Sequence, residues 1–430
     1  MASEETKREV TQIAEAARRA CAELAVTSTE ERNAALAAMA QALRDHAGEI
    51  VAENAADMEA ARAKGTSDAL LDRLMLDDAR LEDMASALED LVALPDPLGV
   101  VQQERTLYNG IELERVSVPL GVVAVVYEAR PNVTADAAGI CLKAGNACVL
   151  RGGSLAARSC AAIARVLAQA ACAAGMPAGC IGAITSTDRA ATDALMQLHG
   201  LIDVLIPRGG AGLIRHCVEH AKVPVIETGT GNCHVYVHAS ADLDKAAAIV
   251  ENAKCRRFGV CNAAETLLVD RDVAETFLPR VLPTLASHGV ALHCDDESFA
   301  VAEALSRDGV DLVFDRADED DWATEYLGPE IAVKCVDGVD EAVAHVNRYG
   351  THHSEAIVAE DAQACERFLA RVDAAAVYAN ASTAFTDGGQ FGLGAEIGIS
   401  TQKLHARGPF ALEALTSYKY VLRGSGQVRA

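Results

Sequence analysis

Cys261 is the residue whose surroundings most clearly suggest chemistry. It follows the glycine-containing segment Phe258–Val260 and precedes a short apolar run at Leu267–Val269. A thiolate attacks acyl carbons readily, and a loop that leads into a strand displays such a nucleophile at the edge of a fold. Upstream, Glu227 stands between a β-branched run and a glycine turn. We therefore predict a thiol nucleophile, with a carboxylate on a second turn as its candidate partner.

The residues around this pair allow more than one role. Glu227 is either a general base that activates a water or the thiol, or a buried carboxylate held by the amides of its turn. Lys254, Arg256 and Arg257 lie just upstream of the cysteine. Their charges could lower the pKa of the thiol or bind a phosphate group. We take Arg257 as a candidate substrate-binding residue.

Asn132 is a candidate for the stabilisation of negative charge on the substrate. It follows the strand-like run Val122–Val126 and the segment Tyr127–Pro131. A side-chain amide at the end of a strand can donate a hydrogen bond to an oxyanion, and the backbone amide of Cys261 would be a second donor. An asparagine after proline also suits an ordinary turn. Arg130 is a candidate for binding an anionic group of the substrate.

Two glycine-rich turns are candidates for binding a dinucleotide. The segment 206–212 ends a predicted strand and opens a predicted helix, and the amides at a helix N-terminus favour a pyrophosphate. The segment 149–154 is a second turn of this kind. Neither turn matches the GxGxxG fingerprint. The candidate cofactor-binding residues on these turns are Arg151, Gly152, Ser154, Gly209 and Gly210.

The elements that must position these residues can be read from the pattern of the chain. Residues 1–94 have the three- and four-residue apolar spacing of helices, with a cap at Ser28–Glu31. Asn109–Gly110 predicts a hairpin that joins 103–108 to 111–118. Strand-like and helix-like segments then alternate, which predicts parallel sheets covered by helices. The predicted strands are 122–126, 147–150, 181–184, 201–206, 223–226, 266–269, 312–314, 331–335, 356–358 and 416–423, and the predicted helices are 155–174, 212–220, 242–255 and 273–288.

The composition excludes several classes of function. The net charge of −24 disfavours binding to nucleic acid or to an anionic membrane. No apolar run is long enough for a membrane span, and the charged N-terminus does not look like a secretory signal. The 13 cysteines are scattered, which predicts reduced thiols and a cytoplasmic protein. No CxxC pair occurs, so we expect no metal site.

Several longer motifs carry a resemblance to a known family. The chain resembles the γ-glutamyl phosphate reductases, within the aldehyde dehydrogenase superfamily, over roughly residues 100–425. One departure is Ala384, where the family usually has arginine, so that another cation such as Arg407 would have to bind the substrate. The motifs that carry the resemblance are Tyr127–Val133, Leu205–Gly210, Val225–Gly229, Cys261–Thr266, His352–Glu355 and Val377–Lys403.

The resemblance implies an aldehyde-dehydrogenase-like fold, with two parallel-sheet α/β domains and a small β arm. Residues 1–102 and 119–228 would form the cofactor-binding domain, and residues 229–403 the catalytic domain. Residues 103–118 and 404–430 would form the arm, through which we expect the chain to assemble into a homo-oligomer.

The resemblance also implies a reaction and a cofactor. At the position of Arg151 the superfamily has a lysine that contacts the adenosine ribose, and it often has a glutamate where this chain has Ser154. A cation without that acid favours NADPH over NADH. Glu325 would bond the nicotinamide ribose. The implied reaction is the NADPH-dependent reduction of γ-glutamyl phosphate to glutamate 5-semialdehyde through a thioester on Cys261, in proline biosynthesis. A separate glutamate 5-kinase, which could associate with the chain, would supply the substrate.

Two other functions stay open on the sequence alone. An aldehyde dehydrogenase that oxidises a small acidic aldehyde to a free acid would need Glu227 as the base that activates water, and it would need no phosphate. A catalytically silent relative would act as a scaffold for the kinase. Intact Cys261 and Asn132 argue against the silent relative.

Overall fold

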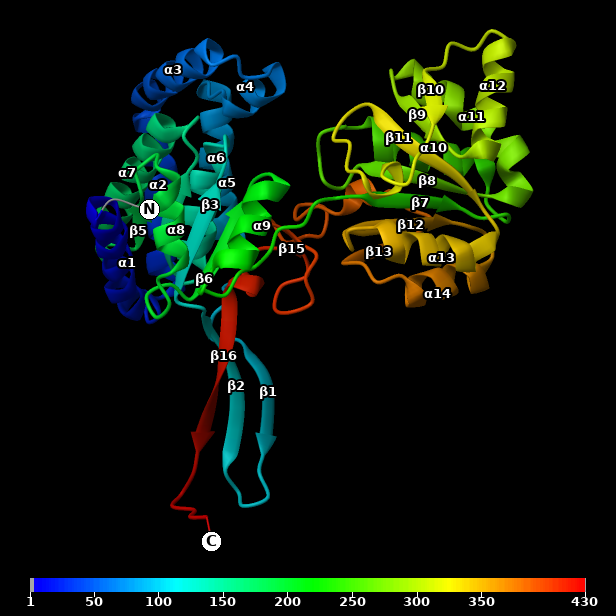
Figure 1. Cartoon of the computed structure of the whole chain (residues 1–430). Helices are drawn as coiled ribbons and strands as arrows, with labels where there is room; N and C mark the ends of the chain where they lie inside the picture. Colours follow the sequence, from blue (N-terminus) through cyan, green and yellow to red (C-terminus); the bar gives the residue numbers. More distant parts are fainter. Residues whose placement is uncertain (1–3, 430) are drawn as a thin grey trace. The chain divides into compact units, whose positions relative to one another are not determined.

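The computed structural model describes residues 4–429, and these fall into two compact units. Within these residues, unit 1 comprises 4–228, 392–398 and 410–429, and unit 2 comprises 229–391 and 399–409. Each unit is built on a parallel sheet with helices packed against it, as the alternation of segments predicts (Figure 1). Across residues 4–429, none of the helices is both long and apolar enough to cross a bilayer.

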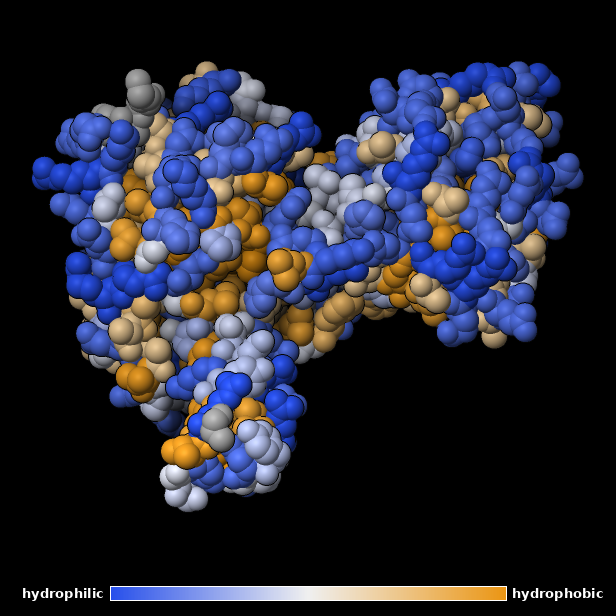
Figure 2. Space-filling model, turned by 60° about the horizontal axis from the view of Figure 1, so that its bottom comes forward, coloured by the Kyte–Doolittle hydropathy of each residue, from blue (hydrophilic) through white to orange (hydrophobic). Residues whose placement is uncertain are grey.

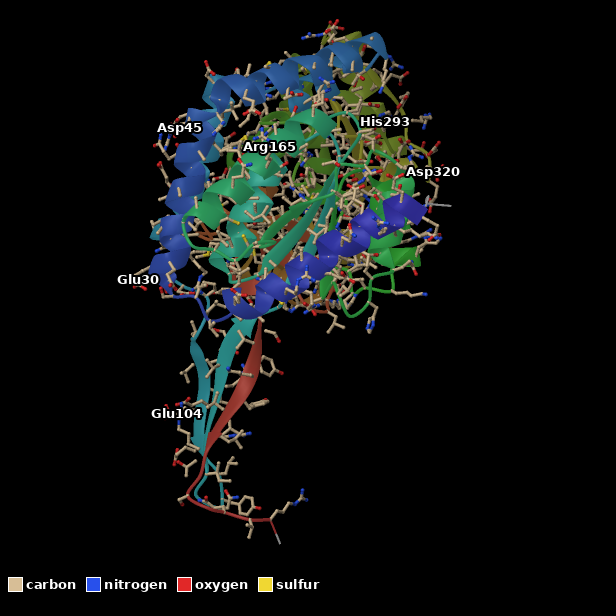
Figure 3. The ribbon with its side chains drawn as sticks, turned by 90° about the vertical axis from the view of Figure 1, so that its left-hand side faces the viewer. Glu30, Asp45, Glu104, Arg165, His293 and Asp320 are labelled. Atoms are coloured by element: carbon tan, nitrogen blue, oxygen red, sulfur yellow. The ribbon has the colours of Figure 1, made fainter. Side chains whose placement is uncertain are left out.

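Unit 1 begins with a run of helices, as the apolar spacing of residues 1–94 predicts. Ser28 caps the second of them through a capping box, in which the Ser28 hydroxyl accepts from the amide of Glu31 at 3.2 Å and the Glu31 carboxylate accepts from the amide of Ser28 at 2.7 Å. Figure 3 shows this helix from the side, with Glu30 near one end and Asp45 at the other. The helices are α1 (Glu4–Leu24), α2 (Thr29–Asp45), α3 (Ala47–Ala63), α4 (Asp68–Leu74) and α5 (Asp78–Ala93).

The sheet of unit 1 has four parallel strands in the order β5-β4-β3-β6. Every residue of the central strand β3 is buried, which explains its continuous apolar sequence. The strands are β3 (Val122–Tyr127), β4 (Ala147–Gly152), β5 (Ile181–Ala183) and β6 (Val204–Arg208), and the helices that follow them are α6 (Asn132–Lys143), α7 (Ala157–Ala173), α8 (Arg189–Met196) and α9 (Ala211–His220).

The prediction of a strand at residues 223–226 is wrong. Only Val225 pairs there, in a single bridge with Leu205. Pro224 has no N–H to donate, so this segment cannot extend the ladder of hydrogen bonds. The turn that carries Glu227 therefore lies against the edge of the sheet instead of ending a strand.

Three antiparallel strands form the arm, in the order β1-β2-β16. They are β1 (Val101–Thr106), β2 (Glu112–Pro119) and β16 (Thr416–Arg423), and the predicted Asn-Gly turn joins the first two. Gly110 has a φ of +80°, which glycine adopts without strain. The arm extends away from the sheet of unit 1 (Figure 1), and its tip and sides carry both hydrophobic and hydrophilic residues (Figure 2).

Unit 2 holds a parallel sheet of seven strands in the order β10-β9-β11-β8-β7-β12-β13. Its central strand β8 (Ala264–Asp270) is buried along its whole length. The other strands are β7 (Cys233–Val237), β9 (Ala291–Cys294), β10 (Phe314–Arg316), β11 (Glu330–Val336), β12 (Ser354–Val358) and β13 (Ala376–Ala379).

Helices pack on both faces of this sheet. One buried cluster joins the sheet to α10 (Leu243–Cys255), α11 (Arg271–Ser287) and α12 (Asp296–Arg307). A second joins it to α13 (Gly338–Tyr349) and α14 (Ala362–Arg371). The remaining short elements are the strands β14 (Gly398–Ser400) and β15 (Gly408–Phe410) and the 3-10 turns η1 (Asp321–Ala323), η2 (Thr383–Phe385) and η3 (Glu413–Leu415).

Candidate active site

Cys261 lies in the turn between the end of α10 and the start of β8, and its side chain is partly buried. Gly231 packs against the backbone of this turn. A Cβ atom at position 231 would lie 1.5 Å from the carbonyl oxygen of Cys261 and 2.7 Å from its Cα. Only glycine therefore allows this approach, and the glycine turn that follows Glu227 serves to place the cysteine.

The residues on either side of this contact hold the turn in place. The Cys233 thiol donates to the carbonyl oxygen of Cys261 at 3.2 Å. The Asn262 side chain donates to the carbonyl oxygens of Ala384 at 3.3 Å and Thr386 at 3.0 Å. In return, the hydroxyl of Thr383 donates to the carbonyl of Asn262 at 2.8 Å. The cysteine turn is thus bonded to the segment that contains Ala384.

His353 belongs to the support of the turn. It is fully buried, and its Nδ1 lies 2.8 Å from the hydroxyl of Ser354 and 3.6 Å from the sulfur of Cys233. Burial lowers the pKa of His353 to about 4, so the ring is neutral at neutral pH. Burial also raises the pKa of the Cys233 thiol well above its usual value. These groups therefore supply neutral hydrogen bonds behind Cys261.

The prediction that Lys254 binds a phosphate is wrong. Its side chain is fully buried and forms an ion pair with Glu265, which is also fully buried. Arg256 and Arg257 are exposed, as a substrate-binding role requires. Charge spacing in the sequence could not show that the first of these three cations turns inward.

Glu325 lies close to the same glycine as the cysteine turn. Its Oε1 accepts from the amide of Gly231 at 2.6 Å. Burial raises the pKa of Glu325, and this hydrogen bond opposes the shift. Gly231 thus contacts both the predicted nucleophile, Cys261, and the carboxylate predicted to bind the nicotinamide ribose.

Arg407 is already engaged within unit 2. It donates to the carboxylate of Asp373 at 2.7 Å, and Lys403 pairs with the same carboxylate at 2.6 Å. The hydrogen bonds from Lys403 and Arg407 lower the pKa of Asp373 to about 2. Two cations around one carboxylate leave a net positive charge for an anionic substrate.

In unit 1, Asn132 is the first residue of α6 and is exposed. Its side-chain amide donates to the carboxylate of Asp136, one turn later, at 3.1 Å. Burial raises the pKa of Asp136 to about 6, and the hydrogen bond from Asn132 and the charge of Arg208 oppose the shift. Arg130 lies in the preceding turn and is partly buried. An amide group has two N–H bonds, so this contact orients Asn132 and still suits it to an oxyanion.

The predicted phosphate turn at the start of α9 holds an anion, and that anion is a side chain of the protein. The amide of Gly210 donates to Oε2 of Glu128 at 2.9 Å. A Cβ at position 209 would lie 2.5 Å from the same oxygen, so glycine is needed there. Glu128 was not among the residues predicted from the sequence, although it directly follows β3, and functional residues gather at the carboxyl ends of parallel strands.

Arg151 lies at the end of β4 and is only 7% exposed. Its guanidinium donates to the carbonyl oxygens of Thr187 at 3.4 Å and Asp188 at 3.2 Å. Burial lowers the pKa of Arg151, and the charges of Glu128 and Asp188 oppose the shift. A small pocket opens nearby between β4, β5 and α7, with Gly152 in its wall, and Ser154 is exposed just beyond it.

Glu227 lies in a turn of unit 1 and is partly buried. Its neighbours fix the turn to β6, because the amide of Ile226 donates to Leu205 at 2.9 Å and the hydroxyl of Thr228 donates to Pro207 at 2.7 Å. The backbone on either side of Glu227 is therefore fixed to β6. Among the predicted residues, Asn132, Gly209, Gly210, Arg151 and Glu227 belong to unit 1, and Cys261, Glu325, Arg257 and Arg407 belong to unit 2.

Comparison with known proteins identifies the family of this chain. Residues 1–302 and 311–421 match the model of the aldehyde dehydrogenase family. The chain belongs to this family. It is 55% identical to a γ-glutamyl phosphate reductase of Moorella thermoacetica over 96% of this chain and 97% of that one. It is 52% identical to that of Halothermothrix orenii over 99% of this chain and 100% of that one.

Solved structures agree with these relatives. The crystal structure of γ-glutamyl phosphate reductase from Thermotoga maritima is 43% identical, with a TM-score of 0.94, over 98% of this chain and 100% of that one. The resemblance drawn from the motifs and the expected fold class are thereby confirmed.

Proposed function

We propose that this protein reduces γ-glutamyl phosphate to glutamate 5-semialdehyde with NADPH, in the synthesis of proline from glutamate. The observation that carries the proposal is the match to γ-glutamyl phosphate reductases along nearly the whole chain. The partly buried Cys261, held in a turn that only Gly231 can accommodate, supports it. The alternatives of a free-acid product and of a silent scaffold have no observation in their favour.

In the proposed mechanism, the Cys261 thiolate attacks the γ-acyl carbon and the carbon–oxygen bond to phosphate breaks, which leaves a γ-glutamyl thioester and free phosphate. NADPH, when bound, would supply the hydride that reduces the thioester. The resulting thiohemiacetal on Cys261 collapses, expels the thiolate and releases the aldehyde. The aldehyde then cyclises, with loss of water, to pyrroline-5-carboxylate.

The remaining candidate residues would stabilise negative charge on the substrate. Asn132 and the backbone amide of Cys261 would donate to the oxyanion that forms at each tetrahedral stage. The hydrogen bond to Asp136 supports this role because it fixes the amide in advance. Arg130, Arg257 and Arg407 would bind the carboxylate and phosphate of a substrate that is strongly anionic, against the net negative charge of the chain.

The residues of both units suit a dinucleotide. The amides of Gly209 and Gly210 open α9, and the carboxylate of Glu128 stands in for a phosphate there. We assign Glu325 to the nicotinamide ribose, and Arg151 and Ser154 to the adenosine half. Arg151 without an acidic neighbour at 154 supports NADPH over NADH. Steady-state kinetics with both cofactors tests this assignment, and an equal or higher kcat/KM with NADH would contradict it.

We propose that Glu227 is not an essential base. Water needs a base to attack a thioester, whereas inorganic phosphate is already an anion at neutral pH. An enzyme that works through an acyl phosphate gains nothing from activating water, because hydrolysis of the thioester would waste the substrate. The test is oxidation of pyrroline-5-carboxylate with NADP⁺. It should require phosphate, and phosphate-independent release of glutamate would favour the hydrolytic alternative.

We infer that the arm joins copies of this chain into a homo-oligomer. All six residues of β1 are exposed, and β16 exposes Tyr418, Tyr420 and Leu422. Figure 3 shows the arm standing clear of the helices of unit 1, with Glu104 on its edge. An exposed strand edge with apolar side chains is a template for pairing with another chain. Residues 103–118 and 416–423 would make this contact.

We also propose a cytoplasmic location and a separate kinase as the source of the substrate. No disulfide bond joins cysteines within residues 4–429, in keeping with a reducing compartment. An acyl phosphate hydrolyses readily, which would favour direct transfer from a glutamate 5-kinase bound to this protein. Co-elution of the two proteins at micromolar concentration tests this association.

A further inference from the structure

A buried ion pair lies behind the cysteine turn, and the mechanism above does not use it. Lys254 lies in the last turn of α10, and Glu265 is the second residue of β8. The ammonium group of Lys254 donates to Oε2 of Glu265, and both side chains are fully buried. Replacing a buried ion pair by apolar groups often leaves stability unchanged or improves it. Stability alone therefore does not explain why two charges are placed here.

The second oxygen of Glu265 points to another role. Its Oε1 accepts from the amide of Leu327 at 3.2 Å. Leu327 has a φ of +52°, in the left-handed region that residues with a Cβ rarely adopt. This hydrogen bond therefore holds the backbone in a conformation that it would not favour by itself.

The segment around Leu327 also carries Glu325. Two residues before Leu327, the Glu325 carboxylate accepts from the amide of Gly231 at 2.6 Å. The segment is thus fixed at two points, to Gly231 and to Glu265. Gly231 contacts the backbone of Cys261, and Glu265 follows Cys261 in the same segment of chain. The segment with Glu325 and the cysteine turn are therefore held in one fixed arrangement within unit 2.

The hydrogen bonds of Lys254 and Glu265 agree with this role. Among residues 4–429, several buried side chains near the sheet have a polar atom without a partner, including His234, His353 and Glu355, but Lys254 and Glu265 do not. Oε2 of Glu265 is taken by the ammonium group and Oε1 by the Leu327 amide. The lysine thereby fixes the rotamer that presents Oε1 to the backbone.

We propose that the Lys254–Glu265 pair positions Glu325. The pair holds the Leu327 amide, and this places the Glu325 carboxylate where it binds the nicotinamide ribose beside Cys261. The proposal rests on the proposed function, which assigns Glu325 to that ribose. It makes Lys254 and Glu265 positioning residues for the nicotinamide half of the cofactor alone. The adenosine half, which we assign to unit 1, should not depend on them.

Two double variants separate positioning from stability. Lys254→Met with Glu265→Met removes both charges and the acceptor for the Leu327 amide. Lys254→Met with Glu265→Gln removes both charges and keeps an oxygen at that place. The Met/Met variant should fold, because apolar replacement of a buried ion pair is tolerated. The Met/Gln variant should fold because it also keeps the hydrogen bond to the Leu327 amide. Thermal unfolding verifies this before binding is measured.

The readout is the affinity of each protein for NADPH and for 2′,5′-ADP, which lacks the nicotinamide half, by fluorescence and calorimetric titration. The Met/Met variant should bind NADPH at least tenfold more weakly than the parent and bind 2′,5′-ADP within twofold of it. The Met/Gln variant should recover most of the NADPH affinity. If the pair had only a structural role, the affinities for NADPH and for 2′,5′-ADP would fall together, or the two variants would lose the same affinity for NADPH.

Contrary results overturn the proposal in distinguishable ways. NADPH affinity within threefold of the parent in the Met/Met variant would overturn it, and the proposed function would stand if Glu325→Gln still weakened NADPH. A parent protein that binds no NADPH would overturn both. If the Met/Met variant does not fold, hydrogen exchange of the Leu327 amide in the parent decides. Protection of the Leu327 amide from exchange supports the positioning role, and exchange as fast as in an open loop contradicts it.

Discussion

Replacing Gly231 with alanine should disable the enzyme without unfolding it. The new Cβ would lie 1.5 Å from the carbonyl oxygen of Cys261 and 2.3 Å from its carbonyl carbon. Real contacts of a Cβ are essentially never below 3.0 Å, so the carbonyl oxygen must move by about 1.5 Å. The atoms in conflict belong to the backbone and cannot swing aside as a side chain can. The cysteine turn itself must therefore move.

A displacement of this size sets the expected loss of activity. A reacting group misplaced by about 1 Å loses roughly 100-fold in rate. We therefore expect kcat/KM of Gly231→Ala to fall by at least about 100-fold, which corresponds to about 2.7 kcal/mol in the barrier. The change also disturbs the amide that donates to Glu325, so the affinity for NADPH should fall as well.

The assay is the phosphate-dependent oxidation of pyrroline-5-carboxylate with NADP⁺, together with thermal unfolding. The matched control is Gly48→Ala in α3, where a Cβ would meet no atom within 4 Å. Alanine favours a helix over glycine, so the control should keep full activity and equal or higher stability. Activity of Gly231→Ala within threefold of the parent would refute the argument that this glycine places Cys261.

Three further predictions concern unit 1 and the arm. Glu128→Gln should tighten NADPH binding several-fold, because the pyrophosphate no longer competes with a carboxylate for the Gly210 amide; equal or weaker binding by titration would contradict this. Asp136 has a raised pKa of about 6, so the folded state holds its proton while the unfolded state loses it, and the parent should lose stability relative to Asp136→Asn as the pH rises from about 4 to 6. Urea unfolding across this range tests the sign, and an unchanged difference between the two proteins would refute it. Light scattering at micromolar concentration should show at least a dimer, with dissociation in Leu422→Glu; a monomeric parent would contradict the role of the arm.

Features with a local cause were predictable from the sequence. The unbroken apolar run of β3 required burial on both faces, and the Asn109–Gly110 pair fixed a hairpin turn. The strand at 416–423 was predicted within its observed bounds, because Tyr418 and Tyr420 alternate with polar residues and Gly424 follows the strand.

Features that depend on distant partners were not predictable. Lys254 turns inward because Glu265 meets it in the core, and no pattern in the sequence places those two side chains together. The strand β7 was missed because His234 breaks its apolar pattern, although Glu355 bonds that ring inside the core at 2.9 Å. The helix α6 was missed because its sequence reads as a turn after Pro131. In each case tertiary contacts outweigh local preference.

In the proposed mechanism, Cys261 carries a thioester that is cleaved by phosphate and not by water in the oxidative direction. The most direct measurement is rapid mixing of the enzyme with pyrroline-5-carboxylate and NADP⁺ in the absence of phosphate. We expect a burst of about one NADPH per active site, since the open-chain aldehyde, the thiol and NADP⁺ give a thioester, NADPH and a proton. Mass spectrometry should find the glutamyl group on Cys261.

Addition of phosphate should then restore steady turnover. Cys261→Ala should show neither burst nor turnover, whereas Glu227→Gln should keep both. Steady formation of NADPH without phosphate, abolished by Glu227→Gln, would contradict the account and show that water activated by this carboxylate resolves the intermediate.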